Sequence, residues 1–207
     1  MIELIERATA HAERVAFRTP AGETRYSELL SRSASLAASL LGDAPDLSEE
    51  RIAFLEPAGA DYAIAQWGIW RAGGIAVPLN REATLPELLH VLQTAGVRRV
   101  LSGAPTEALQ AACAESRAEL IDPAELRADP AMSLPAFEPA RRAMIVFTSG
   151  TTSKPKGVVS THATITAQIR TLVEAWAWRA DDRIPLFLPL HHVHGIVNVL
   201  CCALWSG

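Results

Sequence analysis

Short apolar stretches alternate with helix-forming stretches along the first 122 residues, and this alternation restricts the possible folds more than any other feature. Strands joined by helical crossovers pair in parallel, and a strand that is apolar throughout is covered on both faces. The sequence therefore predicts the α/β class, with a doubly wound, mostly parallel sheet flanked by helices. The strands expected in this part are residues 15–17, 51–55, 75–79, 99–101 and 119–121, and the helices are residues 1–13, 26–41, 58–71 and 105–117.

A further helix is expected behind Thr84, because Thr84 and Glu87 have the spacing of a capping box. In that motif the threonine hydroxyl and the glutamate carboxylate satisfy backbone N–H groups at the start of a helix. The leucines that follow with helical periodicity are Leu85, Leu88, Leu89 and Leu92.

A stretch with four prolines, residues 123–139, reads as a surface connector between two parts of the chain. We therefore divide residues 1–207 into a first α/β half at 1–122, a linker at 123–140 and a second segment at 141–207. The elements expected in the second segment are strands at 143–147, 158–160 and 184–188, and helices at 162–176 and 193–204.

The composition argues against several classes of partner. The 207 residues carry a formal net charge of −4, which gives no reason to expect nucleic acid or an anionic membrane. The longest apolar run, near residues 196–205, is too short to span a bilayer. The three cysteines, Cys113, Cys201 and Cys202, show no C-x-x-C spacing, which favours buried thiols in a reducing compartment. We therefore expect a cytoplasmic protein.

A loop rich in hydroxyl groups follows the strand expected at 143–147. Hydroxyl and backbone N–H groups donate to phosphate oxygens, lysine adds positive charge, and glycine lets the backbone come close. The pattern is not the P-loop, because Lys156 precedes Gly157 instead of following the second glycine. A plain solvated loop is the alternative, but the ordered string directly after an apolar strand favours a phosphate site. Its residues are Thr148, Ser149, Gly150, Thr151, Thr152, Ser153, Lys154, Pro155, Lys156 and Gly157.

This string closely resembles the signature of the adenylate-forming, or AMP-binding, superfamily, which includes acyl-CoA synthetases, peptide-synthetase adenylation domains and luciferases. It departs from the commonest form at Ser153, where glycine is more usual, and serine disfavours a positive φ. The resemblance implies that residues 1–207 are the N-terminal portion of the AMP-binding domain.

Other stretches resemble the malonyl-CoA synthetase branch, and most of all the mitochondrial enzymes of animals. This likeness implies a two-step reaction that uses ATP, Mg²⁺ and coenzyme A. The carboxylate of malonate or another short-chain acid would attack ATP to give an acyl-adenylate, and coenzyme A would then displace AMP. The stretches that carry the likeness are residues 65–67, 73–79, 160–162, 176–178, 181–182 and 188–198.

The resemblance also assigns roles to individual residues. Lys156 and His192 would be catalytic, with Lys156 neutralising the departing pyrophosphate. His194 and Gly195 would join His192 in the substrate pocket. The phosphate-binding set would be Thr148, Ser149, Gly150, Thr151, Thr152, Ser153, Lys154, Lys156 and Gly157.

The histidines of this segment have other interpretations when the family is set aside. His191, His192 and His194 could form a metal cluster, or they could be helix-cap or core residues. The H-H-x-H pattern lacks a nearby carboxylate or cysteine, which argues against zinc.

Later motifs of the family do not occur within the 207 residues. Among them are the glutamate that helps to hold Mg²⁺ and the small C-terminal domain with its catalytic lysine. We therefore expect an N-terminal fragment that is inactive alone and that lacks the C-terminal domain. Two other interpretations stay open: a peptide-synthetase-type adenylation domain that loads an amino or aryl acid, and a non-catalytic nucleotide-binding fragment.

Overall fold

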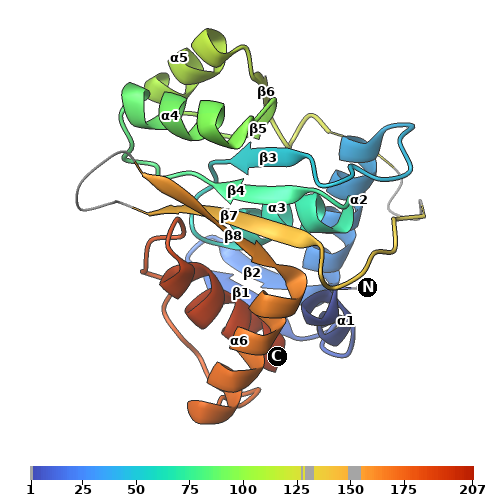
Figure 1. The fold of residues 1–207 in the computed structure, drawn as a ribbon. Coiled ribbons are helices and arrows are strands. Elements are labelled where there is room, and N and C mark those ends of the chain that lie inside the picture. The colour runs from blue at the N-terminus through green and yellow to red at the C-terminus, as the bar shows by residue number, and fades with distance from the viewer. Residues whose placement is uncertain (1, 127, 129–132, 149–154) are drawn as a thin grey trace.

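The apolar stretches form one six-stranded sheet with the strand order β6-β5-β3-β4-β7-β8 (Figure 1). The computed structural model describes residues 2–126, 128, 133–148 and 155–207. Neighbouring strands pair in parallel, except that β8 runs antiparallel to β7. The predicted α/β class with a mostly parallel sheet is thereby confirmed. The strands are β3 (Arg51–Phe54), β4 (Ile75–Pro78), β5 (Arg99–Leu101), β6 (Glu119–Ile121), β7 (Arg142–Thr148) and β8 (Lys156–Thr161).

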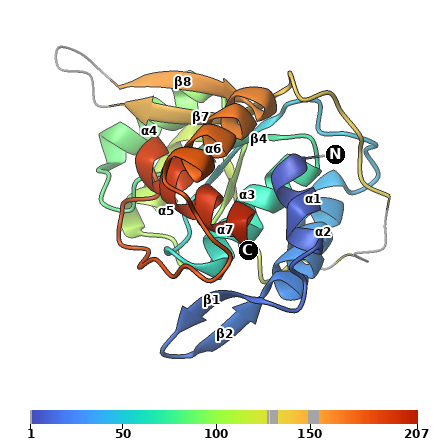
Figure 2. The ribbon, with the colours of Figure 1, turned by 90° about the horizontal axis from the view of Figure 1, so that it is seen from below.

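Helices cover both faces of this sheet, because successive side chains of each central strand point to opposite faces. Ile52 and Phe54 of β3 belong to one apolar core, whereas Ala53 and the following Leu55 belong to the other. Figure 2 shows α1 and α2 on one side of the molecule and α4 and α5 on the other. The helices are α1 (Glu3–Thr9), α2 (Tyr26–Leu41), α3 (Ala60–Arg71), α4 (Leu85–Ala95), α5 (Glu107–Ser116) and α6 (His162–Ala175).

The predicted capping box opens α4. The Thr84 backbone N–H donates to the Glu87 carboxylate at 2.7 Å, and the Thr84 side chain accepts from the backbone at the third helical position. Gly96 closes the helix with a φ of 63°, a left-handed value that glycine adopts readily. Both ends of α4 are therefore set by local sequence.

One strand pair was not predicted in full. β1 (Val15–Thr19) pairs antiparallel with β2 (Gly22–Arg25), and Figure 2 shows this hairpin projecting from the body of the molecule. The sequence analysis identified the first strand but missed the second strand. Its four residues Gly-Glu-Thr-Arg are polar and mostly exposed, so they carry no apolar periodicity to detect.

One expectation for the second segment was wrong, and another was confirmed with a difference in helix type. Residues 184–188, predicted to be a strand, form none, and Ile184 and Phe187 are 41% and 75% exposed. Within the described residues no strand pairs with this stretch, and Pro185 has no backbone N–H to donate to one. The helix predicted at 193–204 begins as a π-helix, η1 (His194–Cys201), and continues as α7 (Cys202–Ser206).

The three cysteines are free and buried, as predicted. No helix in the described part of the chain is long and apolar enough to cross a membrane.

Candidate nucleotide and acid site

The candidate site lies at the carboxyl edge of the parallel strands. β4 and β7 are parallel neighbours, so the loop after β4 and Thr148, the last residue of β7, lie at the same edge (Figure 1). Open α/β sheets bind their ligands outside this edge. Six of the predicted phosphate-binding residues lie outside the described residues: Ser149, Gly150, Thr151, Thr152, Ser153 and Lys154.

The described ends of the predicted phosphate loop form an antiparallel stem. Thr148 is the register partner of Lys156, the first residue of β8, and the Thr148 hydroxyl lies 3.5 Å from the Lys156 carbonyl oxygen. Both residues are exposed. The ladder therefore presents a hydroxyl and an ammonium group together at the carboxyl edge.

Gly157, the next residue of the stem, is register partner to Phe147. A Cβ at Gly157 would lie 2.8 Å from Cγ2 of Ile145 and 3.2 Å from the Phe147 ring. Real Cβ atoms essentially never come as close as 2.8 Å to another side chain, so glycine leaves the room in which these two side chains pack.

The sequence analysis missed a residue of α4 that holds the stem. His90 Nε2 lies 2.8 Å from the Pro155 carbonyl oxygen, and the His90 ring meets the Phe147 ring edge to face. A carbonyl oxygen only accepts, so His90 carries its proton on Nε2 and donates to Pro155. No sequence pattern links residues 90 and 155, and only the packing of α4 beside β8 brings them together.

The histidine segment, which holds His191, His192 and His194 at the start of η1, is held in place by a residue of α3. The Tyr62 hydroxyl, which is buried, donates to the Leu190 carbonyl oxygen at 2.9 Å. Gly195 is buried so close to the chain before it that a Cβ there would lie 2.5 Å from the Pro189 carbonyl oxygen. These two contacts fix the backbone on both sides of His192.

The three histidines differ in their surroundings. The rings of His191 and His192 lie 4.1 Å apart, and burial, with a smaller effect of His192, lowers the pKa of His191. His192 and His194 are exposed. His191 is therefore mainly neutral at pH 7, and His192 and His194 are the two rings accessible to a ligand.

Among the residues that the structure describes, no group of three or more His, Cys, Asp or Glu side chains could hold a metal ion. The histidine segment thus does not form a metal cluster there. The three histidines also do not fit the Mg²⁺ ion that the family resemblance implies. Mg²⁺ prefers oxygen ligands such as carboxylates, whereas histidine offers ring nitrogens.

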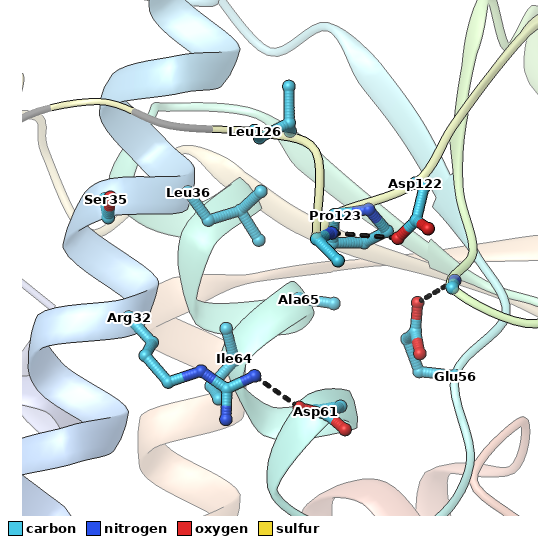
Figure 3. Close-up of a pocket in the computed structure, with 12 residues that line it drawn as sticks. Arg32, Ser35, Leu36, Glu56, Asp61, Ile64, Ala65, Asp122, Pro123 and Leu126 are labelled. Carbon is cyan, nitrogen blue, oxygen red and sulfur yellow. Dashed lines mark hydrogen bonds and ion pairs between the residues drawn. The ribbon is translucent and has the colours of Figure 1, made fainter.

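A separate hollow lies between α2, α3 and the end of β6 (Figure 3), and its volume is about 410 Å³. Arg32 pairs with Asp61 at 2.6 Å on one wall, and Glu56 accepts from the Gly103 backbone N–H at 2.9 Å on another. Burial raises the pKa of Glu56. None of the predicted site residues lines this hollow, so it is not part of the candidate site.

Solved structures with the same fold indicate the class of protein to which this chain is similar. Apo MatB from Rhodopseudomonas palustris is similar, with a TM-score of 0.83 and 25% identity, over 99% of this chain and 44% of that one. The o-succinylbenzoate CoA synthetase MenE from Bacillus subtilis, in complex with the acyl-adenylate intermediate OSB-AMP, has a TM-score of 0.84 and 26% identity. That match covers 99% of this chain and 53% of MenE.

Residues 4–207 match the family described as AMP-binding enzyme, and the chain belongs to that family. The mitochondrial malonate–CoA ligase ACSF3 of Homo sapiens is 40% identical in an alignment of 215 positions, which covers 97% of this chain and 37% of the relative. The malonate–CoA ligase of Arabidopsis thaliana is 38% identical in an alignment of 173 positions, which covers 77% of this chain and 28% of the relative. The chain thus spans well under half the length of these curated relatives.

Proposed function

We propose that the complete protein containing this chain is an ATP-dependent acid–CoA ligase acting on malonate or another short-chain carboxylic acid. The observation that carries the proposal is the stem at the carboxyl edge, where Thr148 and Lys156 stand together. Relatives named malonate–CoA ligase support the choice of acid.

The stem and its loop would bind the phosphates of ATP. In the first step a carboxylate oxygen of the acid attacks the α-phosphorus, the bond from that phosphorus to the bridging oxygen breaks, and pyrophosphate leaves. The Lys156 ammonium would neutralise the charge that builds on pyrophosphate, and the Thr148 hydroxyl would donate to a phosphate oxygen. Hydrogen bonds to charged groups contribute about 1.5–3 kcal/mol each, and those that strengthen as pyrophosphate leaves lower the barrier.

The histidine segment would receive the acid. His192 and His194 are exposed on a backbone that Tyr62 and Gly195 hold in place. A short diacid keeps its second carboxylate when the first reacts, and that group needs hydrogen-bond donors wherever it is taken out of water. In the second step the thiolate of coenzyme A attacks the acyl carbon, and AMP leaves with the electron pair of the broken C–O bond.

Lys156 provides the direct test on the complete protein. We expect Lys156→Ala to lower kcat/KM for acyl-CoA formation by about 100-fold, the effect of losing one charged transition-state contact of roughly 2.7 kcal/mol. The assay measures AMP and acyl-CoA by chromatography with malonate, methylmalonate and acetate as acids. Full activity of the variant, or the absence of acyl-CoA with every acid, would contradict the proposal.

Two alternatives predict other results in the same assays. A peptide-synthetase-type adenylation domain would exchange pyrophosphate into ATP with an amino or aryl acid and form no CoA thioester. A non-catalytic nucleotide-binding protein would be stabilised against heat by MgATP and form no product.

Assayed by themselves, residues 1–207 are expected to form neither AMP nor acyl-CoA. A cytoplasmic location also stays a prediction.

A further inference from the structure

Two consecutive hydrogen bonds connect Gln168 of α6 to Asn198 and Asn198 to His194, and we call this series the line of amides. Gln168 Nε2 lies 2.5 Å from Asn198 Oδ1, and Asn198 Nδ2 lies 3.1 Å from Nδ1 of His194. Gln168 is next to Ile169, which is fully buried in the core against η1, so the start of the line is fixed by packing. His194, at its other end, is exposed.

The line determines which nitrogen of His194 carries the proton. An amide nitrogen only donates, so Gln168 donates to the Asn198 carbonyl and the Asn198 amide then donates to Nδ1 of His194. A neutral imidazole that accepts at Nδ1 has its hydrogen on Nε2, the tautomer that neutral histidine also prefers in water. Within the described ranges Nε2 has no partner, and it stays free to donate outward.

A carboxylate can accept a hydrogen bond from neutral His194 only when the two amides point in this direction. If both amides were turned round, Asn198 would accept from Nδ1–H, and Nε2 of His194 would be an acceptor. A carboxylate has no hydrogen to donate, so it would find no partner on a neutral His194 in that state. Only the observed direction of the line gives a carboxylic acid substrate an N–H donor at this position.

We propose that Gln168 and Asn198 are positioning residues that hold His194 in its Nε2–H tautomer, so that His194 donates a hydrogen bond to the acid substrate. The proposal rests on the function proposed above, because it assumes that a carboxylate binds beside the histidine segment. Neither Gln168 nor Asn198 touches the reacting atoms, and both act through the His194 ring.

The decisive change is Gln168→Glu in the complete protein. A carboxylate at position 168 accepts from the Asn198 amide, turns that amide round and directs its oxygen toward His194. We expect His194 to change from the Nε2–H to the Nδ1–H tautomer, which two-bond nitrogen–proton NMR correlations of the imidazole distinguish. The His194 signals are assigned by their loss in His194→Gln.

The kinetic measurement compares the KM for the acid with the KM for ATP. We expect the KM for the acid to rise at least about tenfold in Gln168→Glu, with the KM for ATP changed less than about twofold. Gln168→Met, which is neutral and similar in size, should give a mixture of tautomers and a smaller rise. Gln110→Glu makes the same chemical change on an exposed position of α5 and should alter neither readout.

The outcomes separate this proposal from the proposed function. An Nδ1–H tautomer in the unmodified protein, or an unchanged tautomer in both Gln168 variants, overturns the proposal even if the protein is an active ligase. An Nε2–H tautomer that reverses in Gln168→Glu, with the acid KM unchanged, overturns the substrate contact. A protein that forms no acyl-CoA with any acid refutes the proposed function, and the tautomer measurement then still tests the line of amides.

Discussion

Two glycines of the candidate site serve to bring chain segments close together. Neither Gly157 nor Gly195 has a positive φ. A Cβ at Gly157 would strike Ile145 and Phe147, and a Cβ at Gly195 would strike the Pro189 carbonyl oxygen. The sequence analysis expected glycine in the phosphate loop to admit phosphate. For Gly157 the structure gives a different physical reason, the packing of β7 side chains across the stem.

His162 makes the stability of the chain depend on pH. Its ring is buried between Trp70 and Phe137, and burial, followed by the charge of Arg141, lowers its pKa to about 4. The unfolded chain takes up a proton near pH 6.5 and the folded chain does so near pH 4, so the folded state loses stability as pH falls through this window. We expect a loss on the order of 2 kcal/mol between pH 6.5 and 4.5.

The measurement is denaturant unfolding at a series of pH values, with His162→Phe as the comparison. Phenylalanine keeps a ring between Trp70 and Phe137 but cannot titrate. Its free energy of unfolding should therefore depend less on pH between 6.5 and 4.5 than that of the unmodified protein. Parallel curves for the two proteins would show that His162 is not the source of the dependence.

At the scale of elements, α4 supports the phosphate stem through one side chain. His90 donates to the Pro155 carbonyl at 2.8 Å, directly before Lys156. We expect His90→Ala to lower the free energy of unfolding by about 1 kcal/mol, the typical contribution of one hydrogen bond. Because Lys156 follows Pro155, the KM for ATP in the complete protein should also rise severalfold.

A matched variant distinguishes the hydrogen bond from the bulk of the ring. His90→Gln keeps an N–H donor at a similar distance and should recover part of the ATP affinity, measured by calorimetry with MgATP. If His90→Ala bound ATP as tightly as the unmodified protein, the contact with Pro155 would have no role in holding the stem.

Elements also show where local sequence was sufficient. The bounds of α2 and the capping box of α4 follow from local residues and were predicted correctly. The apolar stretch at 184–188 has the composition of a strand, but no strand in the described part of the chain pairs with it. Strand formation depends on a partner elsewhere in the chain, so local composition alone gave the wrong answer there.

At the scale of the whole molecule, hydrogen bonds join the segment after the proline-rich connector to the first half of the chain. They lie at the amino ends of the strands, opposite the candidate site. Arg141 makes two hydrogen bonds to the Asp46 carboxylate, at 2.6 and 2.9 Å, and a third to the Gly73 carbonyl oxygen at 2.9 Å. These contacts lower the pKa of Asp46, chiefly through the hydrogen bond from Arg141. Trp70 adds a buried link by donating to the Ala143 carbonyl oxygen at 2.7 Å.

We expect Asp46→Asn to destabilise the protein by about 1–3 kcal/mol at pH 7, because it leaves the partly buried Arg141 without its anion. The stability that the Asp46 carboxylate contributes is present above its unfolded pKa near 4 and is lost as pH falls further, since the folded pKa is lower. Urea unfolding at pH 7 and at pH 3 measures both effects. Arg32→Gln, which removes the exposed pair with Asp61, is the control and should cost less than about 1 kcal/mol. Equal losses in the two variants would contradict the role given to Asp46.

The sequence by itself determined the fold class, most of the strands and helices, and the family, because these depend on apolar periodicity, local capping and an uninterrupted motif. It also placed Thr148, Lys156 and His192 in a candidate site whose roles stay predictions. Only the tertiary structure decided which distant side chains support that site. His90, Tyr62 and Gln168 lie on three different helices, and their contacts with Pro155, Leu190 and Asn198 form only when those helices pack beside the sheet. Such contacts leave no periodic trace in the chain, because a single hydrogen bond between distant residues requires no pattern around either of them.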